Sequence, residues 1–248
     1  MTSSSPNQSS DQDADNEVGI IMLDNSIARP IGDVGNRESY PYPVAFAVTP
    51  NARNTQVVEQ SGAGLCEKFV DTARSLEHAG VSAISTSCGF LAIYQRELAA
   101  SVAVPLATSS LLQIPLVLSL LKPEQRLCVL TANASTLSDR HFESVGIGAD
   151  SRDRIDVVGF ENTEHTYAAL VAEAVVLDPR LVEREIVELA RCAVARTPQI
   201  GAFVLECTNL PPYADAIGAA TERPVWDAVT LIDWMRRGSR RSRATAPC

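Results

Sequence analysis

The sequence predicts an α/β fold built on parallel β-sheet. Three observations predict it: short apolar runs recur along the chain, longer segments with helical spacing lie between them, and a strand–turn–helix pattern occurs in each half. Most of the short runs are continuously apolar, which is typical of strands buried on both faces of a sheet. At 248 residues the chain is long enough to bury a substantial core.

Strands and helices can be assigned in chain order. The segments with the composition of buried strands are residues 18–23, 44–48, 81–85, 126–131, 154–159, 201–206 and 224–228. Two longer segments place apolar side chains at the spacing of a helix. Residues 57–79 end at Gly80, which is a common residue after a helix, and residues 180–196 end before Pro198. Both segments are predicted to be packing helices.

One loop stands out from the other connections. Residues 28–43 form a long stretch rich in Gly and Pro that directly follows the first predicted strand. In parallel α/β sheets, irregular loops at the C-terminal ends of strands are where ligands bind. We therefore expect this loop to border the functional site.

Charge and apolar content argue against two classes of partner. The net charge of −9 argues against a general nucleic-acid binder, which needs a basic field. The exception is an Arg-rich tail, residues 238–248, which we expect to be solvated. No apolar run can span a bilayer, so no membrane contact is predicted. Residues 1–16 are polar, which predicts a disordered lead-in, no signal peptide and a cytoplasmic protein.

Two of the six cysteines occupy equivalent positions in the two halves of the chain. SAISTSCGFLAIYQREL (82–98) and AFVLECTNLPPYADAIGAA (202–220) both run from an apolar strand into a cysteine and then into a helix. Cys88 and Cys207 are therefore predicted to lie at the C-terminal ends of two strands. The other cysteines are interpreted as packing residues or, for the last, as part of the tail: Cys66, Cys128, Cys192 and Cys248.

The positions of these two cysteines suit proton transfer at carbon. Backbone N–H groups at the start of a helix favour a thiolate. Racemisation requires two acid–base groups on opposite faces of a carbon, and a thiol–thiolate pair meets this requirement. Gly89 permits close approach of the backbone. The hydroxyls and amides nearby are expected to hold a substrate carboxylate: Thr86, Ser87, Thr208 and Asn209.

At these residues the chain resembles the aspartate/glutamate racemase superfamily, which also contains hydantoin racemases, maleate isomerases and arylmalonate decarboxylases. The matching segments are TSCGF at 86–90 and LECTNLPPYA at 205–214, with Asn209 where the family has His. The segments 19–36 and 129–137 are similar to further parts of the family, and the resemblance runs from residue 18 to about residue 235.

The resemblance implies two similar flavodoxin-like parallel-sheet subdomains with the active site between them. The first would contain residues 17–112 plus 222–237, and the second residues 113–221. The resemblance also favours a homodimer or a higher homo-oligomer.

Residue roles follow from the same resemblance. Cys88 and Cys207 take the acid–base roles, while Asp24, Thr131 and Asn133 join the residues that line the carboxylate pocket or tune the thiols. The expected function is a cofactor-independent racemase or epimerase of a small carboxylate or amino-acid derivative, of the aspartate/glutamate or hydantoin type. Two cysteines favour this over the decarboxylase pattern, which keeps one.

Two alternatives remain open. One is a maleate-type cis–trans isomerase, in which a thiolate adds to a double bond, and the other is a non-catalytic small-molecule binding or redox-sensing protein on the same fold. No cofactor is expected: the two lysines, Lys68 and Lys122, do not suit a pyridoxal Schiff base, and no Gly-rich nucleotide motif is present. The three histidines show no spacing typical of a metal site.

Overall fold

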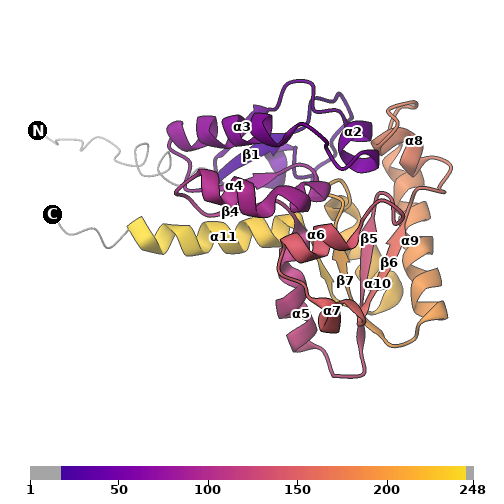
Figure 1. The fold of residues 1–248 in the computed structure, drawn as a ribbon. Coiled ribbons are helices and arrows are strands. Elements are labelled where there is room, and N and C mark those ends of the chain that lie inside the picture. Colours follow the sequence, from indigo (N-terminus) through magenta and orange to yellow (C-terminus); the bar gives the residue numbers. More distant parts are fainter. Residues whose placement is uncertain (1–17, 244–248) are drawn as a thin grey trace, which may run out of the picture.

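The computed structural model describes residues 18–243 and shows two four-stranded parallel sheets flanked by helices (Figure 1). The strands are β1 (Val18–Met22), β2 (Val44–Val48), β3 (Ala83–Thr86), β4 (Leu106–Ala107), β5 (Arg126–Thr131), β6 (Ile155–Gly159), β7 (Ile200–Leu205) and β8 (Val225–Trp226). The α-helices are α2 (Asn54–Glu59), α3 (Cys66–His78), α4 (Gln95–Ser101), α5 (Ile114–Leu120), α6 (Asp139–Ser144), α7 (Ala149–Arg152), α8 (Thr166–Leu170), α9 (Pro179–Arg196), α10 (Ala214–Thr221) and α11 (Ala228–Arg243). Four 3₁₀ helices complete the described residues: η1 (Arg37–Ser39), η2 (Gly89–Tyr94), η3 (Ser110–Gln113) and η4 (Pro211–Tyr213). The predicted fold class is confirmed.

Both sheets have the same strand order. The first runs β2-β1-β3-β4 and the second β6-β5-β7-β8, so the chain reverses direction across the sheet between β1 and β3 and again between β5 and β7. In open parallel sheets, ligands bind beyond the carboxyl ends of the strands at such a reversal. Cys88 follows β3 and Cys207 follows β7, which puts each cysteine at a reversal point.

Alternating side chains of the central strand β1 explain how the first sheet is covered on both faces. Ile20 and Met22 pack with Ile232 of α11. Ile21 packs in the larger core cluster that contains Leu76 of α3. Gly19 lets α3 approach the sheet, because a Cβ there would lie 3.0 Å from Leu76 Cδ1. Burial on both faces accounts for the continuous apolar runs in the sequence.

Two local predictions need correction, and a third is confirmed. The two-residue strand β4 is missing from the prediction because so short a strand has no periodicity to recognise. The helix predicted over 57–79 is divided into α2 and α3, since Ser61, Gly62 and Gly64 adopt positive φ and cannot continue a right-handed helix. The helix predicted over 180–196 forms as α9.

The C-terminal region also differs from expectation. Residues 222–237 were assigned to the first subdomain, but β8 pairs in parallel with β7 of the second sheet, and only α11 packs against β3 of the first. The Arg-rich tail predicted from residue 238 begins as helix, because α11 continues to Arg243. Residues 1–16, the predicted lead-in, and 244–248 lie outside the described residues. The subdomain boundaries themselves remain a prediction.

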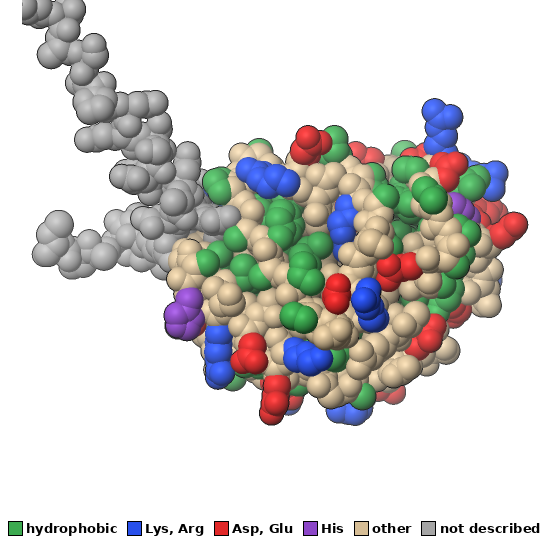
Figure 2. All heavy atoms as spheres, turned by 90° about the horizontal axis from the view of Figure 1, so that it is seen from above, with side chains coloured by type: hydrophobic (Ala, Val, Ile, Leu, Met, Phe, Trp, Pro, Cys, Tyr) green, Lys and Arg blue, Asp and Glu red, His purple; other side chains and the backbone are tan. Residues whose placement is uncertain are grey.

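Between residues 18 and 243 there is no helix whose length and apolar character would let it cross a membrane. On the face seen in Figure 2, basic and acidic side chains are interspersed, so this face carries no continuous basic stripe.

The core of the second sheet offers a test of this packing. Phe203 is fully buried on β7, where its neighbours across the sheet are Cys128 and Val225. Phe203→Ala should lower the free energy of unfolding by about 3–5 kcal/mol. Phe46→Ala on β2, where the phenylalanine is 37% exposed, should cost at most about 1.5 kcal/mol. Urea denaturation measures both values, and equal losses would contradict this description of the core.

Candidate active site

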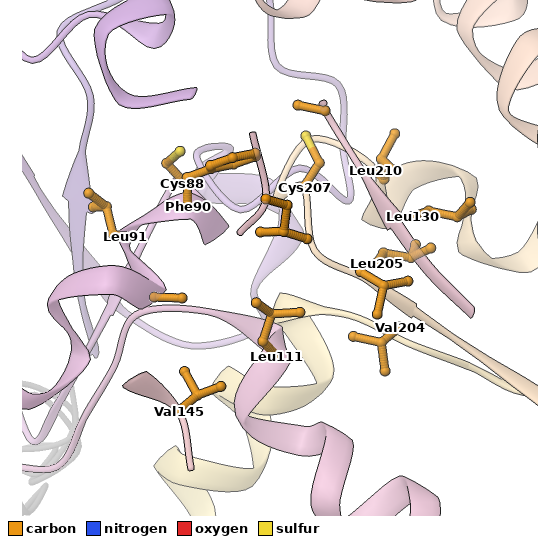
Figure 3. Close-up of a cluster of buried hydrophobic side chains, with 14 of the residues drawn as sticks. Cys88, Phe90, Leu91, Leu111, Leu130, Val145, Val204, Leu205, Cys207 and Leu210 are labelled. Atoms are coloured by element: carbon orange, nitrogen blue, oxygen red, sulfur yellow. The ribbon is translucent and has the colours of Figure 1, made fainter. Parts of the chain in front are cut away.

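The candidate site is a small hollow between the carboxyl ends of the two sheets. About 360 Å³ of space lies between its atoms when the open mouth is counted, but only about 20 Å³ is open to the centre of a water-sized sphere, so at most a small molecule fits. The residues that line it are Leu23, Asn25, Asn54, Val58, Ser87, Cys88, Gly89, Phe90, Ala132, Leu170, Val171, Glu206, Cys207, Thr208 and Asn209. Both halves of the chain therefore contribute to one cavity. In Figure 3 the thiols of Cys88 and Cys207 point to the same side, and the Phe90 ring lies between them.

Cys88 occupies the N-cap position of η2, two residues after the end of β3, and its side chain makes no capping hydrogen bond. Burial raises the pKa of the Cys88 thiol to about 12, and the negative charge of Glu206 adds to the effect. Backbone N–H groups of Phe90 and Leu91, together with the positive charge of Arg29, act in the opposite direction by stabilising the thiolate. Donors that favour thiolate are therefore present, but at this buried position they do not outweigh the cost of desolvation.

Cys207 lies at the end of a chain of polar contacts from the loop after β1. Its Sγ donates to Asn209 Oδ1 at 3.7 Å, and Asn209 Nδ2 donates to Asp33 Oδ2 at 2.7 Å. Asp33 is buried and pairs with Arg29 at 2.9 Å. Burial, followed by the charge of Glu206, raises the pKa of Cys207 well above its usual value. The backbone N–H of Asn209 acts in the opposite direction by stabilising the thiolate.

Glu206 is the residue that the sequence reasoning missed at the centre of the site. Its side chain is fully buried, and Oε2 accepts a hydrogen bond from Thr131 Oγ1 at 2.8 Å. Its Oε1 has no hydrogen-bond partner among residues 18–243. Burial raises the pKa of Glu206 to about 8, although the Thr131 hydroxyl and the Ala132 N–H partly oppose this shift. The carboxyl is therefore mostly protonated at neutral pH.

These shifts correct the expectation that both cysteines would readily form thiolates. The predicted helix starts are present only as short 3₁₀ helices, η2 and η4, while burial and a neighbouring carboxyl dominate. Three acidic groups thus share a desolvated space, and each holds its proton more tightly than it would in water.

Direct hydrogen bonds join the two halves at the site. Thr208 Oγ1 donates to the Ser87 carbonyl at 2.5 Å. Farther along the cleft, Asn54 Nδ2 donates to the Leu170 carbonyl at 3.0 Å. These contacts fix the two strand ends relative to each other, which sets the separation of the thiols.

The structure brings together most but not all of the predicted site residues. Ser87, Gly89, Thr208 and Asn209 line the hollow with the two cysteines. The others lie outside it: Asp24 accepts from Asn51 N and pairs with Arg53, Thr131 lies behind Glu206, and Asn133 accepts from Ser135.

Several residues of the site were not predicted individually. Asn25 and Asn54 line the hollow and are joined by a 2.7 Å hydrogen bond. Asp33 lies in the Gly- and Pro-rich loop that was predicted to border the site, and its bond to Asn209 places part of this loop there. The signal for Glu206 was its position immediately before Cys207, since a charged residue at the end of a continuously apolar strand is unusual.

Comparison with known proteins adds relatives of known activity. The chain is 32% identical over 228 residues to a dimethylsulfoniopropionate lyase of Durusdinium sp. clade D, covering 89% of this chain and 74% of that protein. It is 34% identical to dimethylsulfoniopropionate lyase 5 of Emiliania huxleyi over 90% of this chain and 45% of that protein. Dimethylsulfoniopropionate lyase 3 of the same organism is 32% identical, over 88% of this chain and 58% of that protein. The chain therefore spans less than two thirds of the two Emiliania proteins. No family model matches the sequence.

Solved structures support the fold. Glutamate racemase from Bacillus anthracis superimposes with a TM-score of 0.60 at 10% identity, over 91% of this chain and 82% of the racemase. The Gly74Cys mutant of arylmalonate decarboxylase superimposes with a TM-score of 0.58 at 16% identity, over 93% and 94%. The resemblance to the racemase superfamily therefore holds at the level of the fold.

The predicted racemase or epimerase function is wrong. The relatives at 32–34% identity over most of the chain are lyases, whereas the racemases share only the fold. The broader prediction of an enzyme agrees with the relatives, which are enzymes, but the isomerase class does not.

The influence of Glu206 on the thiols can be measured by alkylation. At pH 9 the Glu206 carboxyl is mostly ionised, so Glu206→Gln removes a negative charge and should lower the pKa of both thiols. We expect iodoacetamide to label Cys88 and Cys207 faster in the variant, by several-fold up to about tenfold, with the ratio approaching one at pH 6. Peptide mass spectrometry measures the rates, and exposed Cys192 is the internal reference. An unchanged ratio at pH 9 would contradict the coupling.

Proposed function

We propose a lyase reaction for this chain, which belongs to the family of dimethylsulfoniopropionate lyases. The proposed substrate is dimethylsulfoniopropionate or a closely similar β-sulfonio carboxylate, and the products are dimethyl sulfide and acrylate. The observation that carries the proposal is the small buried hollow in which a thiol pair and a carboxyl group from both halves of the fold meet. Such a hollow excludes water and suits removal of a weakly acidic C–H proton.

Ser87 and Asn25, two polar residues that line the hollow, suit the substrate's carboxylate. The Ser87 hydroxyl accepts from Leu23 N, so its own proton is free to be donated into the hollow. Asn25 uses one N–H of its amide on Asn54, and the second N–H can reach a ligand. We propose that these donors, which lie on the first half of the chain, hold the carboxylate beside Cys88.

Cys88 is proposed to be the base. Two backbone N–H groups, of Phe90 and Leu91, and the charge of Arg29 favour its thiolate, whereas Cys207 has one such N–H, from Asn209, and its Sγ donates to Asn209 Oδ1. The Cys88 thiolate would take a proton from the carbon next to the carboxylate. Cys207 would remain a thiol and form the opposite wall.

After this proton transfer the elimination needs no second catalytic group. The C–H electron pair forms the carbon–carbon double bond of acrylate, and the carbon–sulfur pair leaves with sulfur. Because the sulfonium is positive, dimethyl sulfide departs as a neutral molecule and needs no general acid. The thiol of Cys88 afterwards returns its proton to solvent. One base is therefore enough for this reaction, in contrast to racemisation.

The reaction itself is tested by incubating the purified full chain with dimethylsulfoniopropionate. We expect equal amounts of dimethyl sulfide, measured by headspace gas chromatography, and acrylate, measured by proton NMR. Cys88→Ser should lower kcat/KM by about 10²-fold or more, since a serine hydroxyl is a far weaker base. Cys207→Ser keeps a donor for Asn209 and should lose less.

Cys192→Ser is the matched control, because this exposed thiol on α9 lies outside the hollow and its loss should leave the rate unchanged. Absence of both products with the folded wild-type chain would overturn the proposed function. A larger loss in Cys207→Ser than in Cys88→Ser would overturn the assignment of the base.

The pH dependence provides a second test. The pKa of the Cys88 thiol is raised to about 12, so at neutral pH only a small fraction is ionised and this fraction grows as pH rises. We expect kcat/KM to increase between pH 7 and pH 9, by up to about tenfold per pH unit. Initial rates in buffers of constant ionic strength measure the slope, and a rate that falls over this range would exclude a thiolate base with a raised pKa.

A further inference from the structure

We propose that Glu206, together with the Phe90 ring and the apolar wall of the hollow, forms a subsite for an onium cation. The inference rests on the proposed function and deepens it, because it assigns the residues that recognise the positively charged end of the substrate. The class of ligand is a small carboxylate that carries a sulfonium or quaternary ammonium group two carbons away.

The first support is an unused acceptor inside the cavity. Glu206 is fully buried, its Oε2 is occupied by Thr131, and its Oε1 has no partner in the described part of the chain. A buried oxygen without a partner is costly, and in native proteins such an acceptor is met by a water, an ion or a ligand, or has a catalytic role. Glu206 is among the residues that line the hollow, and because Oε1 is itself buried, a ligand would contact this oxygen only after a small shift of the wall.

The second support is the close approach of the two halves at this carboxyl. A Cβ at Gly89 would collide with the backbone oxygen and with Oε1 of Glu206. The missing side chain at Gly89 therefore makes room for the carboxyl directly beside Cys88. A cation held by Glu206 would lie within the same small hollow as the base, as a β-onium group must when the base reaches the neighbouring carbon.

The rest of the wall suits methyl groups on a charged centre. Leu23, Val58, Leu170 and Val171 supply aliphatic surface, and Phe90 supplies an aromatic ring. Onium methyl groups are weakly hydrated, and aromatic faces attract them through the ring quadrupole. Among the described residues no lysine or arginine lines the hollow, so none of them supplies a cation that competes for Glu206 there.

The raised pKa of Glu206 also suits a subsite for a cation. Burial raises the pKa of Glu206 to about 8, which keeps the empty site close to neutral. An incoming cation favours the carboxylate and offsets the desolvation of the charge. The ion pair is strongest before the carbon–sulfur bond breaks, because sulfur loses its charge as it leaves. Glu206 should therefore contribute more to substrate binding than to the rate of the bond-breaking step.

The experiment compares two ligands of nearly identical shape. These are 3-(trimethylammonio)propionate, which carries the cation, and 4,4-dimethylpentanoate, in which carbon replaces nitrogen. Calorimetry at pH 8.5 should show that the wild-type chain prefers the onium compound by on the order of tenfold or more. In Glu206→Gln this ratio should fall to near one, while the affinity for 4,4-dimethylpentanoate changes little.

Glu161→Gln is the matched control, because Glu161 also has a buried oxygen without a partner but does not line the hollow, and its ratio should stay at the wild-type value. Using a ratio within each variant removes general damage to the pocket. An equal preference in wild type and Glu206→Gln would overturn the subsite. With dimethylsulfoniopropionate as substrate, Glu206→Gln should raise KM more than it lowers kcat, and the reverse pattern would also overturn it.

Failure of this inference can be told apart from failure of the proposed function. If the wild-type chain releases dimethyl sulfide but Glu206→Gln keeps the onium preference, the lyase function is supported and the Glu206 subsite is contradicted. If the wild-type chain prefers the onium ligand through Glu206 but releases no product, the subsite is supported and the proposed lyase reaction is contradicted.

Discussion

The structure depends on one physical constraint, which is that several acidic groups are buried together where two sets of strand ends meet. Cys88, Cys207 and Glu206 all lose water at this point, and their charges would repel one another. Arg29 is the positive charge that acts on Cys88, and it is already paired with Asp33. The empty site therefore holds its protons. A cationic ligand is the natural complement of such a site, because it supplies the charge that the protein does not.

The burial is possible because the two halves are held together by hydrogen bonds and not by apolar packing alone. Thr208 bonds to the backbone of Ser87, and Asn209 bonds to Asp33 from the loop after β1. At the other side of the cleft, Tyr167 of α8 donates to Glu59 of α2 at 2.6 Å, and Figure 1 shows these two helices side by side. The positions of the groups are set by the fold before any ligand binds, which reduces the reorganisation needed during the reaction.

The sequence carried enough information for the fold class and for half of the site. Continuous apolar runs identify the central strands because these are buried on both faces, and both cysteines follow strands at a reversal of strand order. The sequence could not show that Asp24 points away from the hollow while its neighbour Asn25 lines it, since this depends on the path of the loop. The sequence marks Glu206 as an unusual residue at the end of an apolar strand, but its close approach to Gly89 of the other half depends on the fold.

The incorrect reaction prediction has a physical reason. Racemisation and elimination begin with the same step, removal of a proton from the carbon next to a carboxylate, and a thiolate on this fold suits either. The outcome is decided by the substituent on the next carbon: a poor leaving group leaves the carbanion to be reprotonated, whereas a sulfonium departs as a neutral sulfide. The base therefore carries little information about the reaction. The residues around the β-substituent carry more, and in the subsite proposed for this chain they are a carboxyl oxygen without a partner among residues 18–243, an aromatic ring and aliphatic side chains.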